Sequence, residues 1–147
     1  MAIAVKKVTL WRKEVANDPG VLANVLQPLA AAGANLRVVM GYTIPGESTR
    51  AAIEVFPISG KRASSAAAAV GLGASPISCV LVEGDDRAGL GADMARAIAA
   101  LGVNISFVMA ETVGRKFSAV FGFHSDAAAA AAAKAIKGAA KAKPGRR

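Results

Sequence analysis

The feature that most constrains the fold of this chain is an internal repeat. The segment at residues 30–36 reappears at residues 99–105. With the same offset in numbering, ten of the 36 ungapped positions from Val8 to Thr43 are identical to their counterparts. A repeat of this length predicts two copies of one supersecondary unit. Neither copy is long enough for a large core, so we expect the two to pack together.

The offset between the copies changes once. Beyond Thr43 it becomes two positions smaller, so that Phe56 matches Phe123 and Ser59 matches Asp126. Because length changes belong in loops, the turn after Thr43 is predicted to be two residues shorter in the second copy.

Each copy reads as strand, helix, two hairpin strands and a second helix. Apolar β-prone runs end in turn residues, and each first helix ends at a glycine suited to a left-handed C-terminal cap. The expected ranges are 5–13, 20–32, 36–42 and 50–56 in the first copy, and 77–83, 89–101, 105–111 and 117–123 in the second. Second helices are expected to begin after Ser59 and after Asp126, both good N-cap residues. The alanine-rich second of these has little side chain to bury, so we expect it to dock weakly.

A closing fourth strand is hard to find in either copy. Residues 70–73 are few and glycine-rich, and no β-pattern follows Lys137. The sheets are therefore expected to be three-stranded, or to share strands between the copies. The predicted fold class is α+β, with domains at residues 1–73 and 74–137 and a basic, disordered tail at 138–147.

The positive charge is concentrated in that tail. Of the formal net charge of +8, six units lie in the last fourteen residues, which leaves about +2 for the rest of the chain. We therefore do not expect a nucleic-acid partner. No apolar run approaches the roughly 18 residues of a membrane span, and no signal peptide is evident, so a cytoplasmic protein is expected. The single cysteine, Cys79, fits a reducing compartment.

The repeated turn and helix-end motifs resemble those of the ACT domain, a regulatory module. They read Asn17-Asp18-Pro19-Gly20-Val21 with Gly33-Ala34-Asn35-Leu36, and Asp86-Arg87-Ala88-Gly89-Leu90 with Gly102-Val103-Asn104-Ile105. The resemblance covers nearly the whole chain apart from the tail. It implies two ferredoxin-like units, with an amino acid bound between paired domains, and it does not imply catalysis.

The turn at residues 17–22 has the chemistry that an amino acid requires. Backbone N–H groups of Gly20, Val21 and Leu22 open a helix and suit a carboxylate, while Asn17 or Asp18 oxygens suit an ammonium group. The alternative reading is an ordinary capped helix with a tight turn. The candidate ligand-binding residues are Asn17, Asp18, Gly20, Val21, Leu22, Asn35, Asp86, Arg87, Gly89, Leu90, Asn104 and Ile105.

Helix length limits how these residues can cooperate. A helix over residues 20–32 holds its two ends roughly 20 Å apart, so the turn and Asn35 cannot hold one small ligand together. We expect each site to be built across the copies, about a pseudo-twofold axis, with Asn104 beside residues 17–22 and Asn35 beside residues 86–91.

No catalytic residue, metal or cofactor is expected. Cys79 and His124 are the candidates for a nucleophile and a base, but both align with apolar positions of the first copy and are interpreted as structural. Glu83, Asp85 and Asp86 lack the spacing of a cation-binding loop. The predicted function is a non-enzymatic amino-acid sensor acting as a homodimer or on an enzyme or regulator. The alternatives are a detached regulatory subunit of an amino-acid biosynthetic enzyme, a nucleic-acid binder using residues 134–147, and a purely structural module.

Overall fold

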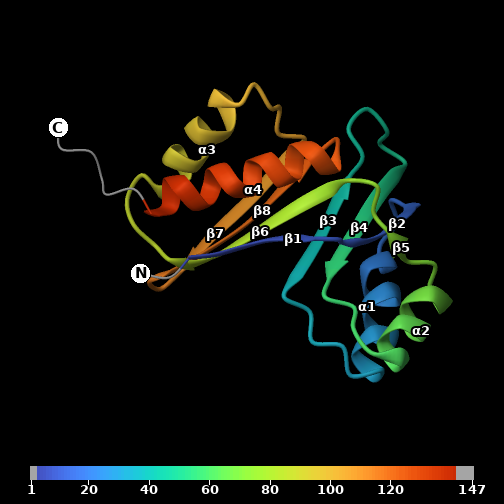
Figure 1. Ribbon diagram of the computed structural model, residues 1–147. Helices are drawn as coiled ribbons and strands as arrows, with labels where there is room; N and C mark the ends of the chain where they lie inside the picture. Colours follow the sequence, from blue (N-terminus) through green and yellow to red (C-terminus); the bar gives the residue numbers. More distant parts are fainter. Residues whose placement is uncertain (1–2, 142–147) are drawn as a thin grey trace. The chain divides into compact units, whose positions relative to one another are not determined.

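The computed structural model describes residues 3–141 and divides the chain into two compact units. Thr9–Ser75 form one unit, here called the inner unit because its segment is enclosed by the other. The residues before and after that segment form the outer unit. Each unit contains a four-stranded antiparallel sheet and two helices (Figure 1).

The inner unit has the strand order β3-β4-β2-β5. Its elements are β2 (Trp11–Ala16), α1 (Val21–Ala31), β3 (Val38–Thr43), β4 (Arg50–Phe56), α2 (Lys61–Ala69) and β5 (Gly73–Ala74). The side chains of Val25 and Leu29 on α1 pack against Ile53 and Val55 on β4, and all four are buried. The closing strand, β5, has only two residues and pairs with Trp11 and Arg12.

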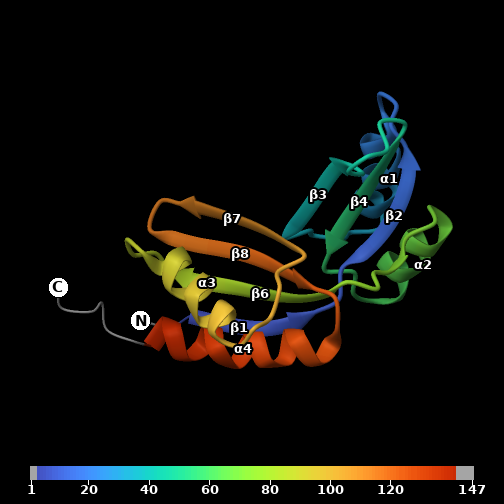
Figure 2. The same ribbon diagram turned by 90° about the horizontal axis from the view of Figure 1, so that it is seen from above.

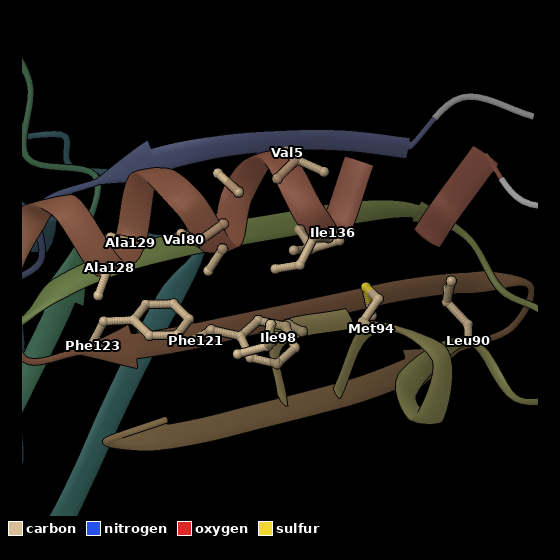
Figure 3. Close-up of a cluster of buried hydrophobic side chains, with 14 of the residues drawn as sticks. Val5, Val80, Leu90, Met94, Ile98, Phe121, Phe123, Ala128, Ala129 and Ile136 are labelled. Carbon is tan, nitrogen blue, oxygen red and sulfur yellow. The ribbon is translucent and has the colours of Figure 1, made fainter. Parts of the chain in front are cut away.

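The outer unit has the equivalent order, β1-β6-β8-β7. Its elements are β1 (Ile3–Val8), β6 (Ser78–Asp85), α3 (Leu90–Ala100), β7 (Phe107–Val113), β8 (Lys116–Phe123) and α4 (Asp126–Lys141). Helices α3 and α4 cover the same face of this sheet (Figure 2). The buried cluster between the layers includes Val5, Met94, Phe121 and Ile136 (Figure 3). The α+β class and the ferredoxin-like fold are thus confirmed.

The first predicted strand is wrong in its extent. Instead of one strand over residues 5–13, the chain forms β1 and β2, which lie in different sheets. β1 pairs with β6 from Ile3↔Gly84 to Val8↔Cys79 and so supplies the fourth strand of the outer unit. Strand sharing, one of the two expectations, therefore occurs in the outer unit. The inner unit instead has a fourth strand of its own, the two-residue β5, which neither expectation included. Residues 3–8 belong to the outer unit, which differs from the expected boundary of 1–73, and the later break falls at Ser75 rather than residue 73.

The predicted match between Phe56 and Phe123 is also wrong, by one position. Val38 lies opposite Phe56, whereas its counterpart in the repeat, Phe107, lies opposite Gly122. Phe56 therefore corresponds to Gly122, and the turn of the second hairpin is three residues shorter rather than two. A slip of one residue moves every side chain to the other face of the sheet. In the observed register, the helix-facing side chains of β4 and β8 correspond to one another.

The expected starts of the second helices need correction. α2 begins after Gly60, whose φ is 84°, with no side-chain cap from Ser59. At α4, the Ser125 hydroxyl accepts a hydrogen bond from the Ala128 N–H at 3.1 Å, so Ser125 caps the helix and Asp126 is its first residue. The serine oxygen satisfies one of the N–H groups left free at a helix start.

Helix α4 is also longer and more firmly packed than predicted. It continues to Lys141, so residues 138–141 are helical rather than part of a disordered tail, and residues 142–147 lie outside the described residues. Ala129, Ala132 and Ile136 are completely buried against the outer sheet and α3. Small alanine side chains let a helix approach its neighbours closely, which offsets the small area that each buries.

Candidate functional site

The turn before the first helix has the same geometry in both units. Gly20 and Gly89 stand at the N-caps of α1 and α3 with φ of 89° and 83°, a conformation that side chains with a Cβ rarely adopt. The Asn17 N–H donates to the Thr49 carbonyl at 2.9 Å, and the Asp86 N–H donates to the Arg115 carbonyl at 2.8 Å. The turn is thereby fixed to the hairpin of its own unit.

One of the three N–H groups expected to be free is used within the turn. The Val21 N–H donates to the Asp18 carbonyl at 3.5 Å, and the Leu90 N–H donates likewise to the Arg87 carbonyl at 3.2 Å. For the Leu22 N–H, residues 3–141 provide no backbone acceptor. The Val21 N–H is therefore the least suitable of the three N–H groups to bind an anion.

A cavity of about 240 Å³ lies beside this turn in the inner unit. Its lining brings together three predicted site residues with strand residues that sequence reasoning missed. The lining residues are Asn17, Val21, Leu22, Gly41, Tyr42, Thr43, Ala51, Ala52 and Ile53. Among these strand positions, the sequence pointed only to Thr43, because the matching position of the second copy, Thr112, is also a threonine.

Asn17 fixes the polar end of the cavity. Its side-chain amide donates to the Ser48 carbonyl at 3.0 Å and lies 3.5 Å from the Thr43 hydroxyl oxygen. This arrangement directs the amide N–H₂ toward the hairpin and leaves the amide oxygen as an acceptor. The Thr43 hydroxyl adds a second group that can accept or donate.

The strand side of the cavity is open because of a glycine. A Cβ placed on Gly41 would meet no atom within 4 Å. Gly41 pairs with Ile53 and Thr43 pairs with Ala51, so these four residues face α1 together. Small side chains at positions 41 and 51 thus keep space between β3, β4 and the start of α1.

The other predicted residues of the inner unit lie outside the cavity. Asp18 and Gly20 are exposed in the turn. Asn35 is exposed beyond the far end of α1, an 11-residue helix about 16 Å long. The lining of this cavity does not include Asn35.

The equivalent turn of the outer unit is occupied by its own structural contacts. Arg87 forms an ion pair with Asp93 at 2.8 Å and lies 3.5 Å from the Ala139 carbonyl. The hydrogen bond from Arg87 is the main reason that the pKa of Asp93 is lowered. Leu90 is buried in the core, while Ile105 packs partly against it. Asp86 and Asn104 are exposed. The expectation that Asn104 lies beside residues 17–22 stays a prediction.

The candidate nucleophile and base differ in exposure. Cys79 is 1% exposed on β6, and its Sγ lies 3.5 Å from the Ile77 carbonyl oxygen. His124 is exposed after the end of β8. Between residues 3 and 141, no group of three or more histidine, cysteine or acidic side chains is arranged to hold a metal ion, and Asp85 bonds to Lys116. No helix in this range is long and apolar enough to cross a membrane.

A buried carboxyl group lies on β4, next in sequence to the cavity residue Ile53. Glu54 on β4 is completely buried, accepts a hydrogen bond from the Tyr42 hydroxyl at 2.8 Å and lies 3.2 Å from the Ser75 hydroxyl. Arg12 Nε lies 4.0 Å from the same carboxyl group. Burial, followed by the hydrogen bond to Glu54, raises the pKa of Tyr42.

A larger cavity of about 610 Å³ lies along β2. Its lining includes Lys13 to Ala16, the part of β2 that β5 is too short to cover. Of the predicted site residues it contains only Val21, and the charged Lys13 and Glu14 border it. The smaller cavity, which is lined by three predicted site residues, is therefore the better candidate for a ligand-binding site.

Comparison with known proteins supports the fold. No protein-family model and no curated protein matches the sequence. A protein from Bacteroides thetaiotaomicron is 15% identical with a TM-score of 0.73, over 90% of each chain. The regulatory subunit of aspartate kinase from Thermus thermophilus, in ligand-free form, is 25% identical with a TM-score of 0.60, over 95% of this chain and 97% of that one. The subunit from Thermus flavus is 23% identical with a TM-score of 0.57, over 96% and 98%. The chain is thus structurally similar to ACT-domain regulatory subunits.

Proposed function

We propose that this chain is a regulatory protein that binds a small amino acid in the 240 Å³ cavity of the inner unit and has no catalytic activity of its own. The observation that carries the proposal is the lining of that cavity, where a helix start and two polar side chains adjoin a small apolar surface. Ligand pockets are commonly about 300–1,000 Å³. A cavity below that range favours a ligand with few atoms.

The lining offers a partner for each part of an amino acid. The carboxylate would receive hydrogen bonds from N–H groups at the start of α1, where the helix dipole favours negative charge. The ammonium group would donate to the Asn17 amide oxygen and the Thr43 hydroxyl. A short side chain would contact Val21, Ala51 and Ile53. No charged side chain lines the cavity, which favours an uncharged ligand side chain.

A second candidate is the detached regulatory subunit of an amino-acid biosynthetic enzyme. The similarity to the Thermus thermophilus subunit favours it, because it extends over 97% of that protein rather than over one module. Affinity purification of the full chain from its source cell would distinguish the two. Recovery of such an enzyme supports this candidate, and recovery of only the chain itself supports a self-assembling sensor.

A thermal-shift screen against the twenty proteinogenic amino acids tests ligand binding. A ligand at 100 times its dissociation constant stabilises the folded state by about 2.7 kcal/mol. We expect a shift with at least one small amino acid and its loss in Thr43→Val, which removes one hydroxyl with little change in shape. Thr112→Val, the matched change in the outer unit, serves as the control and should retain the shift. No shift with any of the twenty would contradict the proposal.

A further inference from the structure

The two units differ at the positions that define the cavity. The outer unit has Phe117 where the inner unit has Ala51, since each lies directly opposite the matched threonine of its hairpin. It has Leu90 where the inner unit has Val21, because both are the first residues of their helices. At both of these positions beside the turn, the inner unit therefore has the smaller residue and the outer unit has the larger one.

Burial shows what the larger side chains do. Phe117 and Leu90 are only 8% and 1% exposed and belong to one buried cluster of the outer unit. Ala51 is also buried, but Val21 remains partly exposed and borders the cavity. A cavity of about 150 Å³ accommodates benzene, so a phenyl ring at position 51 would occupy more than half of the 240 Å³ space.

We propose that the chain has one ligand site, in the inner unit, and that Phe117 closes the equivalent position of the outer unit. This inference rests on the proposed function. The polar end also differs, because the carboxyl group of Asp86 stands where the inner unit has the amide of Asn17. Beside it, Arg87 is held in an ion pair with Asp93. Gly41 and Ala51 then set the largest ligand side chain that the site admits.

Isothermal titration of the full chain, with the amino acid that gives the largest thermal shift among the twenty, tests the stoichiometry. We expect one ligand per chain. Two equivalent sites per chain would overturn this inference while leaving the proposed function intact. Absence of binding by any amino acid would overturn both.

Two pairs of variants locate the site. Gly41→Val places a side chain in open space within the cavity and should weaken binding at least tenfold, whereas the matched Ala110→Val on β7 should leave the affinity unchanged. Ala51→Phe should also weaken binding, and Phe117→Leu should not. Ala51 is buried, so a larger side chain there can disturb folding, and circular dichroism of each variant checks that it is folded. Gly41 and Ala110 are exposed, so the comparison of Gly41→Val with Ala110→Val decides where the ligand binds. Loss of binding in Ala110→Val, with binding retained in Gly41→Val, would contradict the inference.

Discussion

The hydrogen bond from Tyr42 to Glu54 gives a stability prediction that can be worked out from the structure. Tyr42→Phe removes only the hydroxyl that donates to the buried carboxyl group at 2.8 Å. Glu54 is 0% exposed, so water cannot replace this donor without a rearrangement. Leaving a buried hydrogen-bond acceptor without its donor costs about 1–3 kcal/mol. Ser75 and Arg12 still lie near the carboxyl group, which places the expected loss near the middle of that range rather than at its top.

Urea denaturation measures this loss. With a denaturant slope of about 2 kcal/mol per M, a loss of about 2 kcal/mol lowers the unfolding midpoint by about 1 M. A double-mutant cycle with Glu54→Met, which removes both carboxyl oxygens, then isolates the coupling between the two side chains. A Tyr42→Phe midpoint unchanged within error, or a coupling near zero, would refute the assignment of Tyr42 as a main partner of Glu54.

The raised pKa of Tyr42 adds a dependence on pH. The folded state holds the phenol proton more tightly than the unfolded state, in which tyrosine titrates near pH 10. The stability from this group is therefore fully present below about pH 10 and is lost as the pH rises through the raised value. Alkaline denaturation curves should show this loss in the wild type and lack it in Tyr42→Phe. Equal alkaline sensitivity of the two proteins would contradict the predicted sign.

Three further predictions concern the outer unit. Ile136→Ala should lower the free energy of unfolding by about 2–5 kcal/mol, because the Ile136 side chain is completely buried. Its control, Lys137→Ala at an exposed position, should change that free energy by less than about 0.5 kcal/mol. Equal effects of the two changes would show that α4 docks weakly. A chain ending at Lys137 should unfold at lower urea than one ending at residue 141, because Ala139 packs against the core, and coincident curves would contradict this. Cys79→Ser should lower stability by about 1–3 kcal/mol and His124→Ala should not, and a hydrolase or transferase activity abolished by either change would refute the proposed absence of catalysis.

Local sequence signals were sufficient for much of the fold. Gly33 and Gly102, which follow the first helices, stand at positive φ, as their cap positions indicated. The hairpins occur close to their predicted ranges, because apolar alternation and turn residues are local properties. The β1 strand could not be assigned in the same way. Residues 5–13 form one continuous β-prone run, and only the pairing of Val5 with Val82 in the outer sheet shows that the run divides.

The candidate site was predictable at the turn but not on the strands. Asn17 and Val21 belong to a repeated motif and Leu22 directly follows it at the helix start, so sequence could select all three. Gly41 and Ala51 carry no distinctive chemistry, and their importance comes from the space that they leave. Phe117 can be recognised as the counterpart of Ala51 only when the register of β4 and β8 is known. The sequence alignment matched these two strands with an error of one residue. A one-residue error reverses which side chains face the helices.

Nuclear magnetic resonance titration of the full, ¹⁵N-labelled chain with the amino acid selected by the thermal-shift screen tests the central claim most directly. Occupancy of the inner-unit cavity should shift the amide signals of Leu22, Gly41 and Thr43. Their counterparts in the outer unit, Gly91, Ala110 and Thr112, should shift far less. Equal shifts at both sets, or shifts confined to the outer set, would contradict a single amino-acid site in the inner unit.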